Sequence, residues 1–261
     1  MVFGVGTLAI AVALGMSTTA HLTNAALPLK QIVNQLPMGA MLRDAEPIPG
    51  TGKALILYIL DPEIAAEDPL ESYALTCPGE VNGQPIEGVY HLALVEDGAI
   101  VNDVEIPGDS LAEHRPQRLR LVYRQLESIL DGQRGAAMDR VENGTARLVE
   151  AKLLKLRDLN GDGLPHEFTL SYQLGACGHV RVLIAGYSVR QGRAIVYPIL
   201  GDRHSPYYWH DNFFPDKTGT IQWHLSCGDH GSPYGERKMF TFSEKRQAYV
   251  LRTRSQYECD L

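Results

Sequence analysis

Residues 158–172 read Asp-Leu-Asn-Gly-Asp-Gly-Leu-Pro-His-Glu-Phe-Thr-Leu-Ser-Tyr, and this stretch combines a tight turn with the beginning of a strand. After the turn, the apolar residues Phe168, Leu170 and Tyr172 alternate with polar ones, as on a strand with one buried face. Other alternating segments are separated by Gly-containing turns, for example at Asp97-Gly98. The sequence therefore predicts a mostly β protein built from antiparallel hairpins.

The turn places oxygen-bearing side chains at alternate positions. Calcium prefers roughly six to eight oxygen ligands in flexible geometry, and the glycines at positions 161 and 163 allow the backbone to turn back on an ion. The alternative is a plain turn rich in Asp, Asn and Gly. We predict a calcium loop with the ligands Asp158, Asn160, Asp162, the Leu164 carbonyl and Glu167.

The loop resembles the Asp-x-Asn-Gly-Asp-Gly loops of FG-GAP and integrin-type propeller repeats, in which the last acid directly precedes a buried strand residue. Glu167 precedes Phe168 in this way. An EF-hand has a glutamate at its twelfth position, where this chain has Thr169. The whole chain resembles exported bacterial proteins that carry a single loop of this kind. That resemblance implies calcium binding but no particular activity, and the chain resembles no characterised family over its full length.

Residues 1–25 have the pattern of a secretory signal peptide. A continuous run of apolar and small residues, Val2–Gly15, precedes small residues that permit cleavage after Ala20 or Ala25. A membrane anchor is the alternative, but the run is shorter than the roughly 20 residues of a spanning helix. We expect a secreted or periplasmic protein with no stable membrane span after signal cleavage.

The rest of the chain is predicted to form an irregular lead-in at 26–50, rich in proline, and a single β-rich domain at 51–261. One helical insertion is expected near 116–130, where Leu119, Val122 and Leu126 recur at helical spacing. The sheets are expected to form a small propeller or a pair of sheets. Strands are predicted at 53–60, 89–95, 100–106, 147–156, 168–174, 180–187, 194–199, 238–242 and 248–252.

Charge and cysteine content narrow the choice of partner and compartment. The net charge of -7 argues against a nucleic-acid partner, which requires clustered Lys and Arg. Four cysteines in an exported chain predict two disulfides, although the spacing leaves all three pairings open. The disulfide candidates are Cys77, Cys177, Cys227 and Cys259.

Residues 204–230 are rich in histidine and aromatic residues. They suggest a binding face for a protein or carbohydrate ligand, a metal-dependent hydrolase site, or simple packing beneath a long loop. No spacing motif of a known catalytic site accompanies them, so no catalytic residue is assigned. The candidate ligand-binding residues are Trp209, His210, Trp223 and His224. We therefore expect an exported calcium-binding protein that acts as a binding or scaffold module rather than an enzyme, with an exported metal-dependent hydrolase as the alternative.

Overall fold

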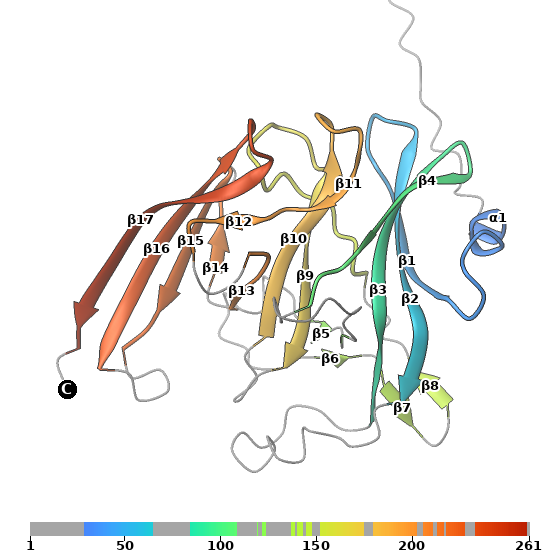
Figure 1. The fold of residues 1–261 in the computed structure, drawn as a ribbon, viewed down its shortest axis with the longest axis horizontal. Coiled ribbons are helices and arrows are strands. Elements are labelled where there is room, and N and C mark those ends of the chain that lie inside the picture. Colours follow the sequence, from blue (N-terminus) through green and yellow to red (C-terminus); the bar gives the residue numbers. More distant parts are fainter. Residues whose placement is uncertain are drawn as a thin grey trace, which may run out of the picture.

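The protein is mostly β, as predicted, and its described strands form open antiparallel sheets with one short parallel pairing (Figure 1). The computed structural model describes residues 29–64, 84–108, 119, 122–123, 137–138, 140–142, 145–147, 152–174, 180–202, 206–210, 213–216, 218–227 and 233–259.

The first sheet, called the N-terminal sheet, is built around three long neighbouring strands. Its strands are β1 (Met41–Pro47), β2 (Lys53–Ile64), β3 (Gln84–Glu96), β4 (Ala99–Glu105), β7 (Arg140–Glu142) and β8 (Thr145–Arg147). The turn between β3 and β4 has positive φ at both Asp97 and Gly98, of 50° and 75°. Two successive positive φ values match the right-handed twist of a hairpin, so the turn predicted at Asp97-Gly98 is confirmed.

Two further sheets follow along the chain. The central sheet contains β9 (Glu167–Leu174), β10 (Val180–Ser188), β11 (Arg193–Val196) and β13 (Trp209–His210). The C-terminal sheet contains β12 (Ile199–Leu200), β14 (Phe213–Pro215), β15 (Thr220–Leu225), β16 (Tyr234–Ser243) and β17 (Ala248–Glu258). Figure 1 shows the central sheet between the other two.

Strand β10 explains this layered arrangement because both of its faces are buried. Leu183 and Ala185 pack into a core shared with the N-terminal sheet. The alternating residues Val182 and Ile184 pack into a second core shared with the C-terminal sheet. An uninterrupted apolar run is what a strand covered on both faces requires.

Two predictions about local structure are corrected. The lead-in at 26–50 is not irregular, because it contains the short helix α1 (Leu29–Val33), which buries Ile32, and the strand β1. The helix predicted at 116–130 is wrong where the structure describes that segment. Leu119 forms a β-bridge with Gly88, and Val122–Tyr123 is the short strand β5, paired with β6 (Ala137–Met138). The buried Leu119 side chain gains its apolar contacts from the core below the N-terminal sheet rather than from helical neighbours.

One further strand prediction is met only in part, and other predictions concern residues outside the described part of the chain. Of the strand predicted at 147–156, the structure describes Arg147, which ends β8, and residues 152–156, which have no strand structure. Residues 1–25 lie outside the described residues, as does the remainder of 116–130. Among the helices that are described, none is long and apolar enough to cross a lipid bilayer.

Candidate functional site

The predicted calcium loop is closed at its base by a β-bridge. Arg157 and Glu167 exchange two backbone hydrogen bonds, with N···O distances of 2.6 and 3.0 Å. The bridge brings the two ends of the loop together where β9 begins. The residues between them form a compact turn at the boundary between the central and C-terminal sheets.

Inside the loop, each polar side chain predicted as a ligand accepts backbone N–H groups. The two carboxylate oxygens of Asp158 accept bonds from Gly161 and Gly163, at 2.7 and 2.9 Å. Both glycines have positive φ, of 81° and 86°, a conformation that other residues rarely adopt. Asn160 accepts from the Asp162 amide at 2.9 Å, and Asp162 accepts from the Leu164 amide at 2.8 Å. These local bonds turn the side-chain oxygens toward the inside of the loop.

Glu167 lies beneath the loop and is fully buried. Its carboxylate accepts hydrogen bonds from the Leu159 amide at 3.2 Å and from the Tyr197 hydroxyl at 3.2 Å. Burial raises the pKa of the Glu167 carboxyl to about 8 against these two favourable bonds, and the nearby charges of Asp162 and Asp158 add to the increase. An ionised Glu167 is therefore costly unless positive charge is supplied.

The Asn160 amide brings the acids of the loop together. Its Nδ2 atom donates to Asp162 Oδ2 at 3.1 Å and to Glu167 Oε1 at 2.9 Å. Among the described residues, no group of three or more His, Cys, Asp or Glu side chains is arranged to hold a metal. The amide group of Asn160 itself stands between the carboxylates. Rotation of that side chain would give up the bond from the Asp162 amide and present the Asn160 oxygen to the acids instead, which would give a donor set made only of oxygen, as calcium prefers.

Leu164 occupies a different position from the other predicted ligands. Its side chain is exposed, and its carbonyl accepts the His166 amide at 3.0 Å. A carbonyl oxygen has a second lone pair, so this bond leaves one acceptor direction for a cation.

The two tryptophans of the histidine-rich segment are core residues. Trp209 and Trp223 are 4% and 9% exposed and belong to the core between the central and C-terminal sheets. Trp209 makes edge contacts with Phe240 and Tyr249, with ring centroids 5.9 and 5.5 Å apart. Of the alternatives drawn from the sequence, packing describes these two side chains.

Trp223 also packs against a buried charged group. The Lys238 ammonium lies 4.5 Å from the Trp223 ring centroid, 2.9 Å from Asp202 and 3.5 Å from Glu236. The Lys238 side chain is 4% exposed, and buried charges of this kind are tolerated only when paired. The sequence carries no signal of this cluster, because Asp202 is 36 residues away from Lys238 along the chain.

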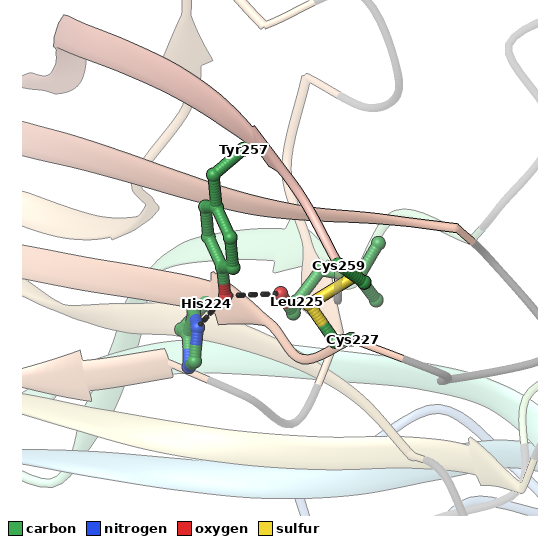
Figure 2. Close-up of a disulfide and its surroundings, with 5 residues drawn as sticks. All are labelled: His224, Leu225, Cys227, Tyr257 and Cys259. Carbon is green, nitrogen blue, oxygen red and sulfur yellow. Dashed lines mark hydrogen bonds between the residues drawn. A yellow bond between two sulfur atoms is a disulfide. The ribbon is translucent and has the colours of Figure 1, made fainter. Parts of the chain in front are cut away.

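Of the four histidines of the segment, only His224 has its side chain in the described part of the structure. His224 stacks on Tyr257 on the face of β15 opposite to Trp223, and its Nε2 lies 2.6 Å from the Tyr257 hydroxyl (Figure 2). The backbone of His210 lies in β13, but its side chain is outside the described part. His204 and His230 are also outside it.

One predicted disulfide is present. Cys227 and Cys259 are bonded, with their Cα atoms 5.6 Å apart (Figure 2). They follow the ends of β15 and β17, the two strands that flank β16, so the bond ties both neighbours of that strand together. Cys77 and Cys177 lie outside the described residues.

Two tyrosines that the sequence did not single out also belong to the loop site. Tyr197 contacts Glu167 as described above, and the Tyr249 hydroxyl donates to the Leu159 carbonyl at 2.8 Å. Both rings are fully buried. Their positions in the sequence carry no signal of this role, since each simply follows or lies in a strand.

In comparisons with known proteins, the chain matches no family model, no curated protein and no solved structure.

Proposed function

We propose that the loop from Asp158 to Glu167 binds one calcium ion, and that the protein is a calcium-stabilised β-rich binding or scaffold protein that acts outside the cytoplasm. The proposal rests on one observation above all. Glu167 is a fully buried carboxyl group in the same loop as two further acids, and the pKa of its carboxyl is raised first by burial and further by the negative charges of Asp162 and Asp158.

A divalent cation bound in the loop would offset the cost of ionising the buried Glu167 carboxyl. Asp158, Asp162 and Glu167 supply carboxylate oxygens, Asn160 supplies its amide oxygen after rotation, and the Leu164 carbonyl completes the set. Calcium accommodates such an irregular set of oxygens better than magnesium, which demands near-ideal octahedral geometry. The ion stabilises the ionised form of Glu167, so calcium binding and proton release occur together.

Other features of the chain support a location outside the cytoplasm. Removal of a signal peptide at residues 1–25 would deliver the protein to an oxidising space, and the Cys227–Cys259 bond is typical of proteins found there. Calcium-binding modules of such spaces work with dissociation constants of about 10⁻⁴ to 10⁻³ M. A site of that affinity serves structural stabilisation.

Thermal unfolding with and without calcium tests the proposal. At calcium concentrations about 100 times the dissociation constant, the ion should stabilise the fold by about 2.7 kcal/mol. For a chain of this size, that corresponds to an increase in Tm of roughly 5–10 °C.

A double substitution in the loop and a control substitution outside it test whether the increase in Tm comes from the loop. Asp158→Asn with Asp162→Asn removes two charges while it keeps amide oxygens as acceptors for the loop N–H groups, and it should abolish the increase. Glu258→Gln removes an exposed charge near the end of β17 and should leave the increase intact. Equal melting of the parent with excess calcium and with chelator would refute calcium binding.

A further inference from the structure

The cation loop lies directly against a turn of the C-terminal sheet. This turn, at Thr218–Gly219, connects β14 to β15. A Cβ atom added to Gly219 would lie 2.1 Å from the Asn160 carbonyl oxygen, and one added to Gly161 would lie 2.5 Å from the Thr218 carbonyl carbon. No side chain fits between the two backbones. The backbone of Asn160 is therefore in direct contact with the turn.

The turn is held rigidly by its own sheet. One carboxylate oxygen of Asp216 accepts the Thr218 amide at 2.8 Å, the Thr218 hydroxyl at 2.7 Å and the Thr220 amide at 3.0 Å. The Gly219 carbonyl accepts the Phe242 amide of β16 at 2.8 Å. The position of the turn therefore follows that of β15 and β16.

A second connection runs through the core. Leu159 lies in the loop, and its side chain is buried in the core between the central and C-terminal sheets. Its carbonyl accepts the Tyr249 hydroxyl of β17 at 2.8 Å, while its amide donates to Glu167. The residue next to two predicted ligands is thus bonded at one end to the buried acid and at the other to the C-terminal sheet.

We infer that the Thr218–Gly219 turn and Tyr249 are positioning elements of the cation loop, and that cation binding and the docking of the C-terminal sheet are thermodynamically linked. This inference rests on the proposed calcium binding. The Asn160 side chain must rotate to present its oxygen, and its backbone carbonyl is in direct contact with Gly219. A loop held in place by a neighbouring sheet loses less entropy on binding an ion. Linkage is reciprocal, so the bound ion should stabilise the docked sheet by the same factor.

Gly219→Ala tests the contact, with Gly192→Ala as a matched control. Both glycines have positive φ, of 72° and 65°, so alanine strains the backbone similarly at each. Only Gly219 has a neighbour, since nothing lies within 4 Å of a Cβ added to Gly192. The difference between the two variants therefore isolates the contact from the strain.

Calcium chloride titration of the full chain by calorimetry gives the first readout. Gly219→Ala should raise the dissociation constant for calcium by at least about fivefold, the lower end of typical coupling between sites. Gly192→Ala should leave that constant within about twofold of the parent value. Tyr249→Phe keeps the buried ring, removes the bond to Leu159 and should weaken binding in the same direction. If Gly219→Ala does not fold, Tyr249→Phe still tests the linkage.

Backbone hydrogen exchange gives the second readout. Calcium should slow exchange in β15 and β17 of the parent as well as in the loop, and this effect should shrink in Gly219→Ala. A parent that takes up no calcium would refute the proposed function. A parent that binds calcium, with an unchanged dissociation constant in both variants and slowed exchange confined to the loop, would refute the linkage alone.

Discussion

Replacement of the buried acid Glu167 by glutamine should remove a specific pH dependence from the stability of the calcium-free protein. Burial raises the pKa of Glu167 from 4.5 to about 8, so the folded protein holds a proton that the unfolded chain releases. A raised carboxyl pKa makes folding most favourable at pH values below 4.5. That stability is lost progressively as the pH rises through the window from 4.5 to 8.

The size of the effect follows from the two pKa values. Each pH unit within the window lowers the free energy of unfolding by up to about 1.4 kcal/mol. Between pH 6 and pH 8, the Glu167 carboxyl should therefore contribute a loss of about 2 kcal/mol. Glutamine cannot ionise, and its amide oxygen still accepts from Tyr197 and Asn160. The variant should lack this loss, although its amide nitrogen faces the Leu159 N–H and lowers stability at every pH.

Urea unfolding at pH 6, 7 and 8 in the presence of a chelator measures the effect. The nine histidines also titrate in this range, so the quantity to compare is the difference between parent and variant. The parent should lose about 2 kcal/mol more than Glu167→Gln between pH 6 and pH 8. Parallel curves for the two proteins would show that Glu167 is ionised at little cost and would contradict the raised pKa of its carboxyl. Because calcium binds the ionised form, its stabilising effect in the parent should also be larger at pH 8 than at pH 6.

Two further predictions concern the C-terminal sheet. Replacement of both Cys227 and Cys259 by serine opens a covalent loop with a sequence separation of 32 residues and should lower the free energy of unfolding by roughly 3–4 kcal/mol; an unchanged urea midpoint would contradict this. Gly235→Ala places a Cβ 2.1 Å from the Tyr257 ring and should cost about 1–3 kcal/mol. The same change made in a Tyr257→Ala background should cost less, and a double-mutant cycle with no coupling would show that the ring moves aside freely.

Much of the strand content could be predicted because alternation is a local property. The segments at 53–60 and 89–95 lie within the longer strands β2 and β3, and the segment at 100–106 matches β4 except for Ile106. Residues 54–60 of the first segment form an uninterrupted apolar run, and its alternate residues are buried in two different cores. The C-terminal strands β16 and β17 are longer than predicted. Their outer halves are polar, and pairing with neighbours rather than an apolar pattern keeps them extended.

The failures have a common cause. Helical spacing at 116–130 took no account of the β-bridge between Gly88 and Leu119. For the aromatic residues at 209 and 223, the sequence left both a binding face and packing open, and the structure places both side chains in a core. Pairing and burial are contacts between distant segments. A single sequence without aligned relatives contains no direct record of them.

The loop from Asp158 to Glu167 shows which properties the local sequence determines and which depend on the tertiary structure. The sequence alone determined its shape, because the bonds of Asp158, Asn160 and Asp162 to backbone N–H groups span no more than five residues. Only the tertiary structure decided the chemistry of Glu167. Its burial brings it beside Tyr197, a residue 30 positions away whose hydroxyl donates to the carboxylate, and that burial raises the pKa of the Glu167 carboxyl.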